Sequence, residues 1–432
     1  MHKIEQLLQT LAPKGVEFRK LGEVLEYDQP NKYCVTSKEF DKSYPTPVLT
    51  AGKTFILGYT NEKDNIYQAS KSSPVIIFDD FTTATQWVDF PFKVKSSAMK
   101  ILLPKNPTIN IRFIFFYMQT IPYNIGGEHA RHWISRYSQL EVPIPPLEIQ
   151  QEIVKILDAF TELNTELNTE LKARKKQYQY YQNMLLDFND INQNHKDAKE
   201  RLAQKPYPKR LKTLLQTLAP KGVEFRKLGD IGEYIRGVTY KKNQEINNLE
   251  CGIKVLRANN ITLSNHLNFE DIKVINKNVK IRKEQYLKKN DILICAGSGS
   301  SEHIGKVAFI DTDFDYVFGG FMGVIRIREV NSRFVYHIFT SNIFKQYLEK
   351  SLNTTTINNL NANILQNFLI PIPPLEIQQE IVTILDQFLA LTTDLLAGIP
   401  AEIEARKKQY EYYREKLLAF KPLTPNKEVK KG

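Results

Sequence analysis

The sequence predicts an α+β fold in which two globular domains are joined by two long antiparallel helices that form a coiled coil. Three segments occur twice, and they give the chain an internal pseudo-twofold repeat. The pairs are residues 7–23 and 214–230 (both LLQTLAPKGVEFRKLG plus one acidic residue), 142–160 and 370–388 (both containing PIPPLEIQQEIV), and 173–188 and 405–420 (both beginning ARKKQY). The chain therefore carries two copies of one frame.

Two inserts lie between the repeats, and they show no visible similarity to each other. They span residues 24–141 and 231–369, which are 118 and 139 residues, so each can bury its own core. Short β-branched and aromatic runs, typical of strands, begin at Pro74, Val88, Asp291, Lys306 and Met322. Aromatic helices are expected from Asn110 and from Ser332. One frame with two unlike inserts suits recognition of two different targets in a fixed geometry.

The first long helix is predicted over residues 146–188. Pro145 and Pro146 precede it, no Gly or Pro follows until past Phe188, and apolar residues recur at steps of three and four. About 40 residues of helix extend roughly 60 Å, so this helix needs a partner along its length. The second copy, residues 374–420, supplies that partner, and Gly398 and Pro400 predict a break or kink in it.

Three tetrapeptides follow one another inside the first helix: TELN at 161–164, TELN at 165–168 and TELK at 169–172. Each adds a little more than one turn. They are either ordinary helix whose leucines recur every four residues, or a ruler whose length sets the separation of the domains. The candidate spacer residues are Thr161, Leu163, Thr165, Leu167, Thr169 and Leu171.

The chain is basic, with a net charge of +11 and a pI near 9.2, which favours a polyanionic partner. The expected domains are residues 1–145 and 214–373, joined by the two helices, with a polar linker at 189–213 and a basic tail at 421–432. Cys34, Cys251 and Cys295 show no C-x-x-C spacing, so we expect small core residues rather than disulfides or a zinc site. No apolar run is long enough to span a bilayer, and we expect a soluble cytoplasmic protein.

Catalytic and cofactor motifs are missing. No D/N-P-P-Y/F tetrad is present, the FGGFMG segment at 318–323 is better explained as a turn than as an S-adenosylmethionine loop, and the Gly-rich segment from Cys295 lacks the Walker A pattern. His129 and His132 have no third ligand nearby, and Asp79-Asp80 has no spaced E-x-K after it. The sequence therefore predicts no catalytic residue, no metal site and no cofactor of its own.

Polar and basic loops in both inserts offer recognition chemistry instead. Bases are read by Arg, Lys, Asn, Gln, Ser and Thr side chains, while Lys and Arg also contact phosphates. The DNA-binding candidates are Thr50, Lys53, Thr82, Thr83, Thr85, Gln86, Arg131, His132 and Arg136 in the first insert, and Arg236, Lys241, Arg257, Asn259, Asn260, Ser298, Ser300, His303, Lys306, Thr356 and Asn358 in the second.

The doubled APKGVEFRKLG segment, the doubled PIPPLEIQQEIV segment before a long helix, and the ARKKQYxYYxxxLL close resemble the specificity subunit of Type I restriction-modification systems. The resemblance covers essentially the whole chain. It implies two target recognition domains that each read one half of a split double-stranded DNA target. It also implies binding to two modification subunits, which carry the S-adenosylmethionine and adenine-methylating chemistry, and to restriction subunits that use ATP and Mg. The TELN units resemble repeats whose copy number sets the spacer.

Two other classes stay open at this point. A self-contained methyltransferase or nuclease is disfavoured by the missing motifs. A noncatalytic coiled-coil scaffold or transcription regulator that spaces two protein-binding domains is disfavoured by the positive charge and the polar loops.

Overall fold

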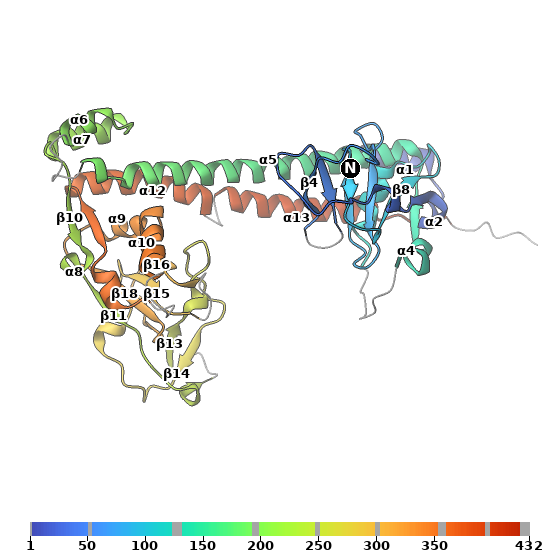
Figure 1. The fold of residues 1–432 in the computed structure, drawn as a ribbon. Coiled ribbons are helices and arrows are strands. Elements are labelled where there is room, and N and C mark those ends of the chain that lie inside the picture. The colour runs from blue at the N-terminus through green and yellow to red at the C-terminus, as the bar shows by residue number, and fades with distance from the viewer. Residues whose placement is uncertain are drawn as a thin grey trace, which may run out of the picture. The chain divides into compact units, whose positions relative to one another are not determined.

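The computed structural model describes residues 2–50, 54–122, 132–191, 198–246, 251–298, 303–352, 360–393 and 398–423 (Figure 1). The chain divides into two compact units: unit 1 contains Met1–Asn168 and Glu402–Gly432, and unit 2 contains Thr169–Ala401. Unit 1 thus takes its last segment from the far end of the chain. Each unit holds one copy of the frame and one insert.

Each frame begins with a helix and a two-stranded antiparallel sheet. In unit 1 these are α1 (His2–Leu11) and the pair β1 (Glu17–Lys20) and β9 (Glu141–Ile144). In unit 2 they are α7 (Lys209–Leu218) and the pair β10 (Glu224–Lys227) and β19 (Leu369–Ile372). The register is the same, because Glu17 lies opposite Ile144 and Glu224 opposite Ile372. A short helix follows the first strand in each, α2 (Leu21–Val24) or α8 (Leu228–Ile231).

The chain after each long helix closes the frame. The Val16 N–H donates to the Lys421 carbonyl at 2.9 Å, and the Val223 N–H donates to the Ile191 carbonyl at 2.8 Å. Gly15 has a φ of +108°, and a Cβ there would lie 2.7 Å from the Pro422 carbonyl oxygen. Only glycine fits this turn without strain. The equivalent glycine of unit 2 also has a positive φ.

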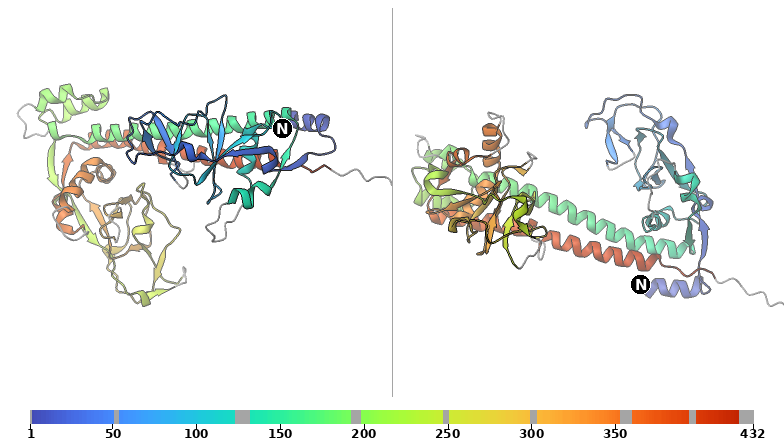
Figure 2. Two further views of the ribbon diagram at one scale, coloured as in Figure 1. Left: turned by 45° about the vertical axis from the view of Figure 1, so that its right-hand side comes forward. Right: turned by 90° about the horizontal axis from the view of Figure 1, so that it is seen from below.

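The long helices are antiparallel partners. α5 (Leu147–Leu186) is continuous over 40 residues. In unit 1, Phe160 of α5 stacks on Tyr413 of α13 (Ile399–Leu418), with ring centroids 5.5 Å apart. In unit 2, Tyr181 of α5 stacks on Phe388 of α12 (Leu375–Thr393), at 4.9 Å. The partner's residue numbers fall as those of α5 rise, and Figures 1 and 2 show the helices side by side. The predicted fold class is confirmed.

The second long segment consists of two helices, as Gly398 and Pro400 predicted. α12 ends at Thr393 and α13 begins at Ile399, one residue before the proline. Proline is tolerated in the first turn of a helix because its missing N–H has no intrahelical acceptor there. Residues 394–397 lie outside the described residues.

Both inserts fold with the same topology, except that the smaller sheet of unit 2 has one additional edge strand, β12 (Glu245–Ile246). The main sheet of unit 1 has the strand order β2 (Leu25–Asp28), β8 (Met99–Pro104), β5 (Val75–Asp79) and β6 (Thr85–Val88), and that of unit 2 has β11 (Gly232–Arg236), β18 (Met322–Ile327), β15 (Ile292–Cys295) and β16 (Val307–Phe309). The smaller sheet of unit 1 has the strand order β4 (Ile56–Thr60), β3 (Thr46–Leu49) and β7 (Lys93–Val94). That of unit 2 has the strand order β12, β14 (Lys273–Ile275), β13 (Ile253–Leu256) and β17 (Tyr316–Phe318). β3 and β7 are parallel, as are β13 and β17.

The middle strands β5 and β15 are buried on both faces because alternate side chains point to opposite sides. Ile76 and Phe78 face the core beneath the helices, whereas Ile77 faces the core under the smaller sheet. Ile294 and Leu293 divide in the same way in unit 2. The helices that cover the face of the main sheet opposite the smaller sheet are α3 (Ile111–Met118) in unit 1, and α9 (Ser332–Phe339) and α10 (Asn342–Leu352) in unit 2.

The inserts are attached to the frame by one repeated arrangement. Asn110 caps α3 by accepting from the N–H groups of Arg112 and Phe113, and Asn331 caps α9 with the same geometry. The guanidinium of Arg112 then pairs with Asp158 of α5 at 2.8 Å. In unit 2, Arg333 pairs with Asp386 of α12 at 2.9 Å. Two short Asn-x-Arg-Phe segments thus hold two otherwise unlike inserts in equivalent positions.

The residue four positions after the arginine that pairs with the frame differs between the units. His337 of α9 is 0% exposed, and its Nε2 lies 2.9 Å from Asp386. The hydroxyl of Tyr178 lies 3.4 Å from Nδ1, and Gln182 donates to the His337 carbonyl. Burial lowers the pKa of His337, so the ring is held neutral. Phe116 takes this position in unit 1, four residues after Arg112 as His337 is four after Arg333.

The described parts of the predicted linker, residues 189–191 and 198–213, belong to the fold of unit 2. They contain α6 (Ala198–Gln204) and the start of α7. Leu202, Tyr207 and Leu211 are buried in the main core of the unit. These three apolar side chains, spaced through a polar sequence, explain why the segment folds rather than remaining an open connection.

No helix among the described residues is long and apolar enough to cross a membrane. The three cysteines differ in their surroundings. Cys295 is buried and Cys34 is partly buried, as expected of small core residues. The same prediction is wrong for Cys251, which is exposed and precedes β13 by two residues. Burial raises the pKa of the Cys295 thiol, which keeps it protonated.

Candidate nucleic-acid interface

The predicted loops of unit 1 meet at one turn between β7 and β8. This turn, residues 95–98, is here called the central turn of unit 1. The Lys95 N–H donates to the carbonyl of Leu49, which precedes the loop containing Thr50. The Ala98 carbonyl accepts from the N–H of Asp80, and the Asp80 carbonyl accepts from the N–H of His132. Backbone hydrogen bonds therefore bring the three predicted loops of the first insert together.

The predicted loops of unit 2 meet at the equivalent turn between β17 and β18. This central turn of unit 2 is residues 319–321. The Gly319 N–H donates to the carbonyl of Leu256, which precedes Arg257. The Phe321 carbonyl accepts from the N–H of Ala296, and the Ala296 carbonyl accepts from the N–H of Leu360. Each of these bonds matches one in unit 1.

The strand that leads to Arg236 also ends at this turn. The Gly237 N–H donates to the carbonyl of Met322, and the Val238 N–H donates to that of Phe318, at 3.1 and 2.7 Å. A Cβ on Gly237 would lie 2.1 Å from the Gly319 carbonyl oxygen, so only glycine allows this close approach. Four loops that are far apart in sequence are thus connected to one turn by backbone hydrogen bonds.

The two central turns have the same backbone connections but different side chains. Asp80, Ala98 and His132 of unit 1 correspond to Ala296, Phe321 and Leu360 of unit 2 by their hydrogen bonds. A fixed backbone with exchanged side chains is the arrangement expected of two surfaces that recognise different partners in the same orientation.

Five of the predicted residues lie outside the described residues: Lys53, Arg131, Ser300, Thr356 and Asn358. Among the others, Thr82, Gln86, Arg136, Arg236, Lys241 and Asn259 are exposed, while Thr50, Thr83, Thr85, Arg257, Ser298 and His303 are partly exposed. Three of the exposed residues, Arg136, Arg236 and Lys241, are basic and lie close in sequence to the backbone hydrogen bonds that connect the loops at the central turns. These side chains are accessible to a large ligand.

The turn after β5 is held by its own carboxylates. The Thr82 hydroxyl donates to Asp79 at 2.5 Å, and Thr83 has a φ of +58°. Asp80 accepts from the Trp133 N–H at 2.9 Å and pairs with Lys100. Asp79 and Asp80 are both buried, so they stabilise the loop and present Thr85 and Gln86 on the following strand. His132, also predicted as a DNA contact, is buried.

Two predicted residues of the second insert have internal roles. The Lys306 ammonium is buried and donates to the carbonyls of Ala258 and Ile261, and burial lowers its pKa. Asn260 is buried and its side-chain amide donates to the carbonyls of Asn268 and Asp271. Their polarity therefore serves to satisfy buried backbone groups. Sequence alone could not separate them from solvent-facing loop residues.

Arg257 and Asn259 are tied to one carboxylate. Arg257 pairs with Asp271 at 2.7 Å, and the Asn259 amide donates to the same carboxylate at 2.8 Å. These hydrogen bonds lower the pKa of Asp271, so it stays ionised. The charge of Arg257 is thereby neutralised locally, whereas Arg236 forms no ion pair with any residue that the structure describes.

A cavity of about 530 Å³ lies beside the central turn of unit 2. It is lined by Tyr234, Arg236, Phe321 and Asn361, among others. Tyr234 lies across Gly323, where a Cβ would meet its ring at 2.1 Å. Burial raises the pKa of Tyr234, so its hydroxyl remains a hydrogen-bond donor.

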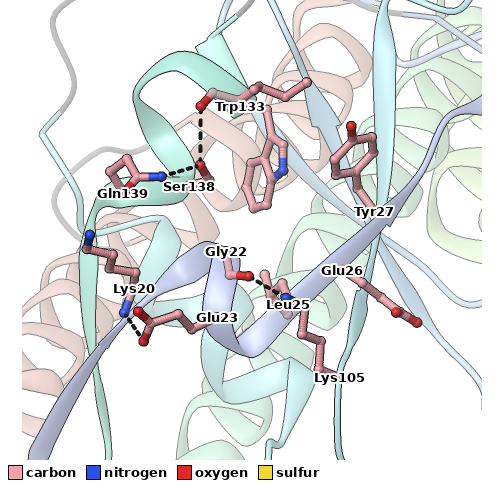
Figure 3. A pocket seen from close by; sticks show the side chains of 11 residues that line it. Lys20, Gly22, Glu23, Leu25, Glu26, Tyr27, Lys105, Trp133, Ser138 and Gln139 are labelled. Carbon is pink, nitrogen blue, oxygen red and sulfur yellow. Dashed lines mark hydrogen bonds between the residues drawn. The ribbon is translucent and has the colours of Figure 1, made fainter.

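Unit 1 has a cavity of about 600 Å³ at a different place (Figure 3). Frame residues Lys20, Gly22 and Glu23 form one side of it, and Trp133 lies opposite. The Lys105 ammonium donates to the Gly22 carbonyl at 2.6 Å. Because no residue of the central turn lines this cavity, we do not place base recognition there.

The tetrapeptides form an uninterrupted part of α5. Leu167 is 9% exposed, Leu163 and Leu171 are partly exposed, and Thr165 and Thr169 are exposed. Thr161 and Thr165 each donate their hydroxyl to the carbonyl four residues earlier. The division between the two units falls between Asn168 and Thr169, inside the repeats.

Within the described ranges, no group of three His, Cys, Asp or Glu side chains is arranged to hold a metal ion. The fold and the central turns instead define a class of protein in which a duplicated helical frame carries two loop-built recognition surfaces.

Comparison with known proteins identifies the family. The model of the Type I restriction modification DNA specificity domain matches residues 13–177 and 220–405. The chain is 38% identical to the specificity subunit of the Type I restriction enzyme EcoR124I/EcoR124II of Escherichia coli, over 98% of this chain and 99% of that one. It is 31% identical to a putative Type I restriction enzyme specificity subunit of Haemophilus influenzae, over 94% and 96%. The chain therefore belongs to the Type I restriction-modification specificity subunits.

A solved structure has the same fold. The S subunit of a Type I restriction-modification system from M. genitalium superposes with a TM-score of 0.57 over 94% of this chain and 96% of that one, at 12% sequence identity. At that identity the likeness concerns the fold alone.

Proposed function

We propose that units 1 and 2 each read one half of a split double-stranded DNA target, and so determine the sequence on which a Type I restriction-modification complex acts. One observation carries the proposal: two central turns share their backbone hydrogen bonds but differ in the side chains they present. Equal geometry would place two stretches of one duplex against equivalent surfaces, and unequal side chains would select different bases.

The exposed candidates divide by the chemistry of their contacts. Arg136, Arg236 and Lys241 would approach phosphates or guanine edges, since cations neutralise the backbone and arginine can bind guanine with two hydrogen bonds. Gln86 and Asn259 would contact base edges through their amides. His132, Asn260 and Lys306 are left out of this set because they are buried.

The helix α5 would fix the distance between the two half-sites. Since α5 runs without interruption from one unit into the other, its length would set the number of unspecified base pairs between the two readers. The repeated TELN units, with leucines at 163, 167 and 171, allow that length to change in steps of four residues.

The chain would act without catalysis of its own. We infer that two modification subunits supply S-adenosylmethionine and adenine methylation, one for each copy of the frame, and that restriction subunits supply ATP- and Mg-dependent cleavage. Membership of the specificity family and the duplication of the frame support these assignments.

The test combines the chain with its modification subunits and maps the methylated adenines in host DNA. A bipartite target with two defined halves is expected, and binding to a duplex carrying it should weaken steeply as salt rises, because phosphate contacts release counterions. Methylation or cleavage by the purified chain alone would contradict the proposal. A single undivided target would contradict it as well.

A further inference from the structure

Phe321 is an apolar side chain held in solvent at the central turn of unit 2. It is 75% exposed, the largest exposed fraction among the large apolar side chains that the structure describes as exposed. A single exposed hydrophobic residue is common and does not by itself indicate a binding site. Phe321 also lies on a hydrogen-bonded turn and beside polar and cationic side chains, and these two features together indicate a contact with a ligand.

Backbone hydrogen bonds fix the turn that carries Phe321. The Phe321 carbonyl accepts from the N–H groups of both Ala296 and Gly297, each at 2.9 Å. The Met322 N–H closes the turn by donating to the Gly319 carbonyl at 2.8 Å. Because Cys295 of β15 pairs with Met322 of β18 directly beside this turn, the backbone that carries the ring is held by the sheet.

Polar and cationic groups surround the ring. Tyr234, Arg236 and Asn361 line the same cavity as Phe321. Two lining carboxylates are neutralised by arginines, Glu233 by Arg328 at 2.9 Å and Glu284 by Arg282 at 3.1 Å.

The remaining lining charge is that of Arg236, which is exposed and forms no ion pair with the residues in the described ranges. An aromatic ring beside a cation on a rigid loop suits a polyanion with flat apolar faces, which is the chemistry of stacked nucleobases.

Unit 1 offers an internal comparison. Ala98 takes the position of Phe321, since its carbonyl accepts from Asp80 as that of Phe321 accepts from Ala296. A methyl group there cannot enter a base stack. Any role of the ring must therefore be confined to unit 2.

We propose that Phe321 is a wedge that contacts the base stack of the half-site bound by unit 2, and that unit 1 binds its own half-site without one. This inference rests on the proposed function, because it requires unit 2 to bind duplex DNA. Proteins that insert apolar side chains between base steps locally unstack and bend the duplex. The two halves of the target would then differ in deformation as well as in sequence.

The direct test replaces Phe321 with tryptophan and measures the fluorescence of the new side chain. The chain's two tryptophans, Trp87 and Trp133, both lie in unit 1, so Phe321→Trp puts a separate reporter in unit 2. Leu369→Trp is the matched control, because Leu369 is 52% exposed in unit 2 but does not line the cavity. Both variants are assembled with the modification subunits, and duplex DNA carrying the mapped target is added.

Stacking on bases is expected to quench the emission of Phe321→Trp and to leave that of Leu369→Trp unchanged. Phe321→Ala should weaken binding to the intact target about tenfold, and should not weaken binding to a duplex whose second half-site is scrambled. If the modification subunits alone quench Phe321→Trp, the ring is covered by protein and the wedge is refuted. If the wild-type complex binds the bipartite target but Phe321→Trp shows no quenching, the wedge alone is refuted. If the wild-type complex binds no DNA, both proposals fail.

Discussion

Deleting residues 165–168, one TELN unit, should shorten the spacer of the DNA target. The deletion removes about 6 Å of helix at roughly 1.5 Å per residue, and about 400° of rotation at 3.6 residues per turn. The net change in direction is only about 40° beyond a full turn. Leu171 then takes the place of Leu167, the most buried leucine of the repeats, so the apolar face of α5 is preserved.

DNA rises about 3.4 Å per base pair, so a shortening of about 6 Å along an inclined helix corresponds to one base pair, and at most two. Methylation mapping of the deletion strain should find both half-site sequences unchanged and the unspecified spacer shorter, by one base pair. A variant with Thr165→Ala, Glu166→Ala and Asn168→Ala keeps the helix length and should keep the spacer. An unchanged spacer in an active deletion variant would refute the ruler.

Three further changes test the fold and the site. Gly237→Ala should destabilise unit 2 by about 2 kcal/mol, because its Cβ would lie 2.1 Å from the Gly319 carbonyl oxygen; chemical denaturation measures this. His337→Phe, which copies Phe116, should flatten the pH dependence of Tm: the folded pKa of His337 is lowered, so its stabilisation is present above the unfolded pKa of about 6.5 and is lost as the pH falls below that value. Lys306→Met should lower Tm by leaving buried carbonyls unpaired, at a cost of about 2 kcal/mol, without changing the salt dependence of DNA binding.

Each of these changes has an outcome that would count against it. A fully stable Gly237→Ala variant would mean that the turn is not as tightly packed as described. Equal loss of Tm between pH 7 and pH 5 in His337→Phe and wild type would show that the ring does not titrate in that window. A reduced salt slope in Lys306→Met would place its ammonium on phosphate, where we expect Arg236→Ala to show that effect instead.

The repeats made the frame predictable. Identical LAPKGVEFRKLG and PIPPLEIQQEIV segments imply identical local structure, and α5, α12 and α13 follow the proline, glycine and apolar spacing of the sequence. The shared topology of the inserts was not visible, because a strand requires only alternating apolar residues, and many sequences satisfy that. The one available signal was the pair of Asn-x-Arg-Phe segments at Asn110 and Asn331, whose polar residues cap a helix and pair with the frame.

The sequence predicted which loops would lie together better than which of their side chains would face solvent. The predicted loops do meet at the two central turns, since loops at one end of a sheet are neighbours in space. Which polar side chain faces solvent depends on contacts that are distant in sequence, so the buried roles of Lys306 and Asn260 could not be foreseen. The exposure of Phe321 was not predicted for the opposite reason, because an apolar residue between glycines and strands is expected to be covered.

We propose that the two units read their half-sites independently of each other, and an exchange of one insert tests this. Residues 24–141 are replaced by the corresponding insert of another specificity subunit, and the methylated target is mapped with the same modification subunits. We expect one half of the target to change, while the other half and the spacer length stay the same, because the frame, α5 and unit 2 are untouched. A change in both halves would contradict it.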